Sequence, residues 1–207
     1  MKEWEHYFGK VGVEPPLPTD IARTLHNSCP FWPEKKIKDT HLLVLIPSTV
    51  DGKPFTLNLL RDLIQSPGRV GYRTQYRDYD YDVQQIFGNQ YPRSSYWVLV
   101  TRDVLPDSRF KTCIQQEELV ATQARRTEMP YKMPRVLEMA TAILSNYTRS
   151  GERLYADTPW TYTRCQEMIP CFTDASVFVG GFSSGGLSIS DDFVPNRNYG
   201  VSSLLRY

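Results

Sequence analysis

Long apolar stretches and a charge excess are both missing from this sequence of 207 residues. The longest apolar run, Leu42–Ile46, is far shorter than the roughly 20 residues of a membrane-spanning helix, so no membrane contact is expected. Lysine and arginine number 24 against 23 aspartates and glutamates, a balance that argues against a general nucleic-acid binder. The first ten residues lack a secretory core, which predicts a cytoplasmic protein or one secreted without a cleavable signal peptide.

Metal-binding patterns are also absent. The four cysteines form no C-x-x-C pair, and the three histidines lie far along the chain from the Cys165/Cys171 pair. We therefore expect no metal and no cofactor. Without a secretory signal the thiols are expected to be free, although Cys165 and Cys171 are close enough in sequence to meet across a loop.

Composition and patterning predict one α+β domain over residues 1–207. Hydrophobic residues make up 41% and charged residues 23%, as in folded proteins, and no linker or repeat interrupts the chain. Residues 1–40 are rich in proline and are expected to wrap around the domain, whereas residues 154–207 are expected to form short strands. The segments 40–47 (THLLVLIP) and 95–101 (SYWVLVT) are predicted strands, both too apolar to lie at a sheet edge.

Helix signals are clearest at three places. Thr56 is a predicted cap for a helix that carries Leu57, Leu60 and Ile64. A second helix is expected over 113–126, and the strongest runs from 133–134 to a stop at Gly151. Glu138 is expected off the apolar stripe of this last helix, as a solvated or hydrogen-bonded residue rather than a catalytic base.

Four short strands are expected near the C-terminus, at 160–165, 176–182, 186–189 and 199–205. Glycine pairs at 180–181 and 185–186 bracket Phe182–Ser184 and favour a bulge or a close backbone approach. A phosphate-binding loop is excluded because neither a lysine nor a helix follows.

Residues 69–92 interleave tyrosine with arginine and aspartate. Tyrosine and arginine together suit stacking on single-stranded nucleic acid, but the aspartates repel phosphate at the same place. We therefore expect a solvated hairpin or long loop with packed tyrosine rings, and no nucleic-acid partner.

Several unusual strings occur in order: EPPLP (14–18), CPFWP (29–33), GERLY (151–155), PWTYTRCQE (159–167) and VGGFSSGGL (179–187). On these strings the chain resembles an uncharacterised domain family of amoeba-associated, Parachlamydia-type chlamydiae. That family occurs alone or joined to F-box-like, leucine-rich or other eukaryote-like modules. The resemblance implies no particular chemistry, and it makes the protein a bacterial effector candidate.

A second resemblance concerns the fold. The order SYWVLVTRDV, MPRVLEMA, WTYTRCQE, VGGFSSGG and NYGVSSLLRY is similar to the formylglycine-generating-enzyme branch of the C-type-lectin-like fold. It implies two or three helices packed on twisted, mostly antiparallel short strands. The branch's arginine before Gly-Gly is replaced here by Val179, and its catalytic cysteine pair and calcium ligands are not recognisable. Neither oxygenase chemistry nor calcium-dependent sugar binding is therefore implied.

In lectin-like relatives the ligand surface lies between the Gly-Gly strand and the last strand, which corresponds to residues 183–199 here. The candidate binding residues are Asp191, Asp192, Phe193, Asn196, Arg197, Asn198 and Tyr199. Tyrosine and arginine anchor protein partners well because each joins contact area to a directional polar group. The leading hypothesis is a non-catalytic recognition module for a protein partner, with an ordinary solvated loop as the alternative reading of this segment.

Two other functional classes stay open. A cysteine-dependent enzyme would use Cys165 with Glu167, which the period of a strand places on one face, and Arg164 would favour the thiolate. Such an enzyme needs a histidine base, and the sequence does not say which of the three histidines approaches. An inert structural or fusion domain would instead present no exposed aromatic surface.

Overall fold

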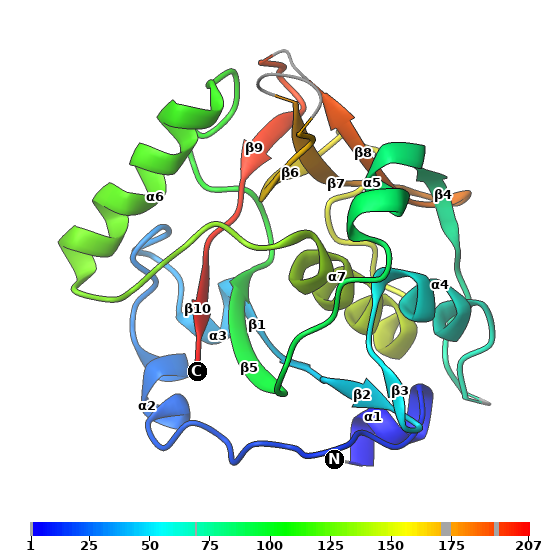
Figure 1. Cartoon of the computed structure of the whole chain (residues 1–207). Coiled ribbons are helices and arrows are strands. Elements are labelled where there is room, and N and C mark those ends of the chain that lie inside the picture. The colour runs from blue at the N-terminus through cyan, green and yellow to red at the C-terminus, as the bar shows by residue number, and fades with distance from the viewer. Residues whose placement is uncertain (1, 69, 171–174, 193–194) are drawn as a thin grey trace.

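Helix α7 (Val136–Ser150) lies between two sheets and contacts strands of both (Figure 1). The computed structural model describes residues 2–68, 70–170, 175–192 and 195–207, with the backbone alone for residues 2–3. The helices in these ranges are α1 (Lys2–Tyr7), α2 (Ile21–His26), α3 (Ile37–Thr40), α4 (Leu57–Gln65), α5 (Tyr81–Phe87), α6 (Cys113–Thr127) and α7. None of them is long and apolar enough to cross a membrane.

The strands of the described ranges form three sheets. They are β1 (His41–Ile46), β2 (Thr49–Val50), β3 (Lys53–Pro54), β4 (Tyr76–Tyr79), β5 (Tyr96–Thr101), β6 (Tyr162–Met168), β7 (Ser176–Ser183), β8 (Gly186–Asp192), β9 (Tyr199–Val201) and β10 (Leu204–Arg206). One sheet has the order β1-β5-β10, a second is the ribbon β2-β3, and the largest has the order β4-β8-β7-β6-β9. One hydrophobic cluster extends from α7 into both larger sheets and joins them in one α+β domain, while a second cluster packs around Phe31, Leu99 and Leu205.

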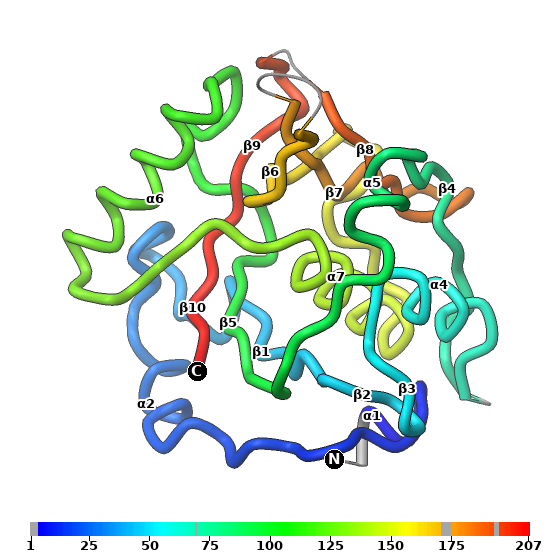
Figure 2. Tube along the Cα trace, viewed as in Figure 1, coloured from blue at the N-terminus to red at the C-terminus, as the bar shows by residue number. Residues whose placement is uncertain are grey.

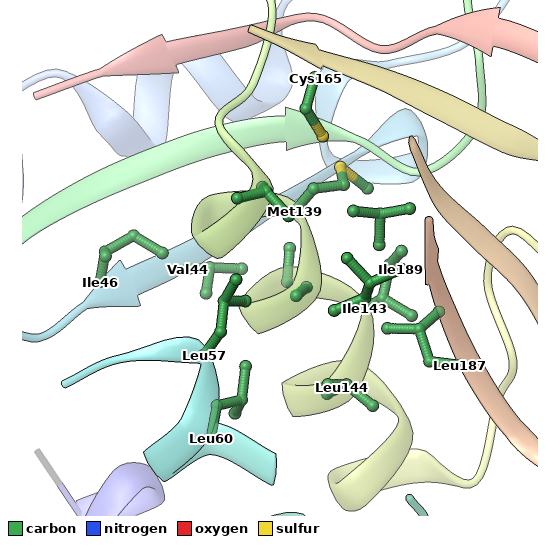
Figure 3. Packing of buried hydrophobic residues seen from close by; sticks show 14 of the residues in the cluster. Val44, Ile46, Leu57, Leu60, Met139, Ile143, Leu144, Cys165, Leu187 and Ile189 are labelled. Carbon is green, nitrogen blue, oxygen red and sulfur yellow. The ribbon is translucent and has the colours of Figure 1, made fainter. Parts of the chain in front are cut away.

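The start and end of the long helices follow from local sequence. Thr56 accepts a hydrogen bond from the N–H of Leu59 at 3.0 Å, and this capping bond begins α4 as predicted. Gly151 takes a φ of +73° and ends α7, also as predicted. In Figure 3, Ile143 of α7 lies between Val44 of β1 and the β8 residues. The amphipathic stripe thus becomes the centre of the core.

The number of helices differs from the prediction. The sequence predicts two or three, and the described chain has seven. Three of them, α4, α6 and α7, have nine to fifteen residues and match the predicted segments. The other four have four to seven residues. Of these, α2 has a local sequence signal, because Thr19 or Asp20 can cap a short helix that carries Ile21 and Leu25. The other three depend on tertiary contacts, which a local pattern does not reveal.

Strand β5 is central, as predicted, but the prediction that β1 is central is wrong. Strand β1 pairs with β5 and lies at the edge of its sheet. The N-terminal segment crosses the outside of this sheet and buries the second face of β1 (Figure 2). Phe31 stacks on His41 with ring centroids 6.0 Å apart, and Trp97 donates its indole N–H to the carbonyl of Pro15 at 3.1 Å. Burial by a wrapping segment therefore looks the same in sequence as burial by neighbouring strands.

Most strand pairs of the described chain are antiparallel, as predicted, but the largest sheet is mixed. Strands β8, β7 and β6 are antiparallel neighbours, whereas β4 runs parallel to β8 and β9 parallel to β6. The predicted strand 199–205 is in fact two strands, because β9 joins this sheet and β10 joins the three-stranded one. Between them, Ser202 donates its N–H to Thr163 and Ser203 donates its N–H to Thr101. Buried threonine hydroxyls thus satisfy the backbone where the chain crosses between sheets.

Of the segment 69–92, residue 69 lies outside the described residues, and residues 70–92 do not form the predicted hairpin or loop. They contain β4 and α5, and the side chain of Asp80 caps α5 by accepting from the N–H groups of Asp82 and Val83. The rings of Tyr76 and Tyr79 meet edge to face with centroids 5.0 Å apart. The Tyr76 hydroxyl donates to the carbonyl of Leu57. These tyrosines pack against the protein.

Substitution of Gly180 tests the close backbone approach at the bulge in β7. A Cβ atom there would lie 2.3 Å from the carbonyl oxygen of Thr161 and 2.7 Å from the Cα atom of Tyr162, and φ is +154°. We expect Gly180→Ala to lower the free energy of unfolding by roughly 2 to 4 kcal/mol, measured by urea denaturation. The control Gly52→Ala also has a positive φ, +75°, but meets no atom within 4 Å. Gly52→Ala should lower the free energy of unfolding by about 1 kcal/mol. Equal losses in the two variants would contradict the steric argument.

Candidate functional site

Trp160 is a large aromatic side chain that is 41% exposed just before β6. Its indole lies parallel to the ring of Tyr162, with an interplanar angle of 6° and centroids 6.1 Å apart. The guanidinium carbon of Arg77 lies 5.0 Å from the indole centroid. Two neighbours from β6 and β4 therefore fix an exposed ring in one orientation.

Arg77 is itself held by several acceptors. Its Nε donates to Asp78 at 2.7 Å, and Nη1 donates to the carbonyl of Gly181 at 3.2 Å and to Ser183 Oγ at 3.3 Å. These bonds join β4 to the β7–β8 hairpin. The guanidinium is therefore pre-positioned beside the indole.

Arg109 connects the loops on the other side of Trp160. It donates to the carbonyl of Arg197 at 2.9 Å and to Thr161 Oγ1 at 3.0 Å. Both acceptors are neutral, so these bonds position the guanidinium without cancelling its charge. The open hollow beside the indole is lined by Arg109, Asp157, Thr158, Pro159, Trp160, Arg197 and Asn198. We call Arg77, Arg109, Trp160, Tyr162, Arg197 and Asn198 the Trp160 surface.

The predicted binding residues do not form one patch. Arg197 is exposed and lines the hollow together with Asn198. Asn196 instead shapes its own turn, because its Oδ1 accepts from the N–H of Asn198 at 3.0 Å. Phe193 lies outside the described residues.

Tyr199 and Asp192 are engaged with each other. The Tyr199 hydroxyl donates to Asp192 Oδ2 at 2.6 Å, and its ring stacks on Phe178 with centroids 4.3 Å apart. Burial, followed by the Asp192 carboxylate, raises the pKa of Tyr199. Asp191 is separated from this pair because successive side chains of β8 alternate between faces. Burial and then Asp80 of the α5 cap raise the pKa of Asp191.

Sequence reasoning did not select Arg77, Arg109 or Trp160 as binding residues. Trp160 begins the predicted strand 160–165, but the sequence does not show that its side chain is exposed. These residues are tens of positions apart and come from separate loops and strands. No spacing pattern in the sequence brings them together.

Cys165 is sealed in the core. It is 1% exposed, and its sulfur points toward Met139 of α7 (Figure 3). Burial raises the pKa of this thiol well above its ordinary value, which disfavours the nucleophilic thiolate. Among the described residues no hydrogen bond joins a histidine to it. The geometry gives Cys165 no route to a substrate.

The other cysteines and histidines do not supply a reactive centre in the described part of the chain. Cys29, Cys113 and Cys165 are free thiols, and Cys171 lies outside the described residues. Burial lowers the pKa of His41 to about 4. No group of three His, Cys, Asp or Glu side chains in the described ranges is arranged to hold a metal ion.

Glu138 is 1% exposed, so the expectation that it is solvated is wrong and its hydrogen-bonded alternative is confirmed. It accepts from the Tyr96 hydroxyl at 2.8 Å, from the N–H of Arg135 at 2.7 Å and from the guanidinium of Arg206. Its neighbour Glu167 accepts from the N–H of Val136 at 2.9 Å. The two carboxylates bind successive N–H groups where α7 begins, which is a stabilising position for negative charge.

Comparison with protein-family models, with curated proteins and with solved structures found no match to this chain. The chlamydial family and the C-type-lectin-like fold therefore stay predictions from the sequence.

Glu167 makes stability depend on pH. Burial, followed by the nearby Glu138, raises its pKa from 4.5 to about 7. The folded state therefore binds this proton more tightly than the unfolded state does. The contribution of Glu167 to stability is largest below about pH 4.5 and is lost as the pH rises through about 7, by roughly 3 kcal/mol in total.

We expect Glu167→Gln to remove this loss, because an amide oxygen still accepts from Val136 without carrying charge. Urea denaturation of wild type and variant at pH 5 and pH 8 would measure it. Glu34→Gln, at an exposed position, is the matched control and should keep the wild-type slope. A Glu167→Gln protein with the same pH slope as wild type would contradict the assignment.

Proposed function

We propose that the protein is a non-catalytic recognition module that binds an acidic segment of a partner protein through the Trp160 surface. The observation that carries this proposal is an exposed indole held in a fixed orientation beside a guanidinium group. Side chains that are already ordered lose little entropy on binding. Tryptophan and arginine are also the residues that most often dominate protein interfaces.

The charges around the hollow favour an acidic partner. Arg109 and Arg197 line it together with one carboxylate, Asp157. Guanidinium groups bind carboxylates through two parallel hydrogen bonds, while the indole supplies apolar contact area beside them. A nucleic acid is disfavoured because Asp78 and Asp157 lie next to the arginines and the chain has a net charge of only +1.

We further propose the C-type-lectin-like fold for this chain. The order of α7, β6, the β7–β8 hairpin and β9 supports it, as do the loops that β6 and β9 bring to one end of the large sheet. A cytoplasmic or signal-independent secreted effector is proposed on the sequence resemblance alone.

The binding proposal is tested by selecting a phage-displayed peptide library on the intact protein. We expect the selected peptides to be enriched in Asp and Glu. Trp160→Ala and Arg197→Ala should each weaken binding of a selected peptide at least about tenfold, or roughly 1.4 kcal/mol, by calorimetry. Tyr81→Ala is the matched control, because Tyr81 is 70% exposed on α5, outside the Trp160 surface.

Thermal unfolding of each variant would check that the fold is retained. Peptides that bind both surface variants as tightly as wild type would overturn the site assignment. Failure to select any peptide would favour the inert structural domain.

A further inference from the structure

A second hollow lies between α1, α7 and β1, away from the residues of the Trp160 surface. Its apolar walls are formed by Trp4, Tyr7 and Phe8 of α1, by Leu42, Leu43, Val44 and Leu45 of β1, by Trp97 of β5 and by Ala142 of α7. The remaining lining residues are Ser145, Asn146 and Arg149, also of α7. Its volume is about 100 Å³.

The position of the hollow follows from the fold. Strand β1 is an edge strand, so no neighbouring strand fills the space along it. On α7, Ala142 and Ser145 face this space with short side chains, while larger residues such as Ile143 and Leu144 fill the core. An edge strand opposite small helix residues leaves room that the protein's own side chains do not occupy.

The polar groups all lie on one wall. Successive turns of α7 place Ser145 and Arg149 in line, because residues four apart share a helix face. Ser145 Oγ is buried and makes no hydrogen bond within the described ranges. Arg149 is exposed at the rim and donates to Asn146 Oδ1 at 3.5 Å. No acidic side chain of the described residues lines the hollow.

We propose that this hollow binds a small molecule with an apolar body and a carboxylate group. The tryptophan and leucine side chains surround the apolar body, and Ser145 and Arg149 receive the carboxylate. Concave apolar sites with a few convergent polar groups are the usual form of small-molecule sites. At about 30 Å³ of liquid volume for each water, the hollow corresponds to roughly three waters, which suits the short chain of a molecule such as propionate or butyrate.

The tryptophans provide an internal control for the test. Trp4 and Trp97 line the hollow, whereas Trp32 and Trp160 do not. Propionate and butyrate would be titrated into the full chain and followed by the NMR signals of the four indole N–H groups. We expect the signals of Trp4 and Trp97 to shift and those of Trp32 and Trp160 to stay in place.

The role of charge is tested with propionamide and butyramide, which keep the apolar body and lose the carboxylate. We expect each amide to bind at least tenfold more weakly than its acid. Arg149→Met should remove this difference, because it keeps the side-chain stem and loses the cation. The exposed Arg93→Met is the matched control and should leave both affinities unchanged.

A third variant, Ser145→Leu, fills the hollow and should abolish binding of acid and amide alike. Absence of any shift of Trp4 and Trp97 at high acid concentration would overturn the proposal. Equal affinity for acids and amides, or an Arg149→Met protein that still prefers the acids, would overturn it as well.

Discussion

The burial of α7 on almost every side is the constraint on which the rest of the structure depends. One sheet covers each of its two broad faces, and the apolar residues of both sheets meet on it. A charged side chain in such a position is costly unless it is paired and hydrogen-bonded, since water does not reach it. Glu138 shows how this is done, because its carboxylate accepts from Tyr96 of β5 and Arg206 of β10. The same bonds that satisfy the buried charge also fix the three-stranded sheet against the helix.

The two parallel strand pairs determine where the candidate binding residues lie. Pairing of β9 with β6 brings the loop that carries Arg197 next to the loop that carries Trp160, and Tyr162 donates its N–H to the carbonyl of Asn198. Pairing of β4 with β8 brings Arg77 to the β7–β8 hairpin. The Trp160 surface is thus a consequence of how the edges of the large sheet are built.

Local chemistry explains the parts of the fold that the sequence predicted well. The Thr56 cap, the Gly151 stop and the apolar run of β5 act over a few residues. Hydrophobic periodicity and capping residues therefore identified α4, α6, α7 and most strands of the C-terminal part. For the proposed Trp160 surface, the sequence pointed to Arg197 and Asn198 but not to their neighbours.

By itself the sequence determined an α+β chain with three substantial helices, because periodicity and caps are properties of neighbouring residues. Tertiary structure alone decided that β1 is an edge strand, that residues 199–205 divide between two sheets and that Tyr199 binds Asp192. It also decided that Cys165 and Glu138 are buried and Trp160 is exposed. The physical reason is that burial and pairing depend on which distant segments pack together, and no short stretch of chain carries that information.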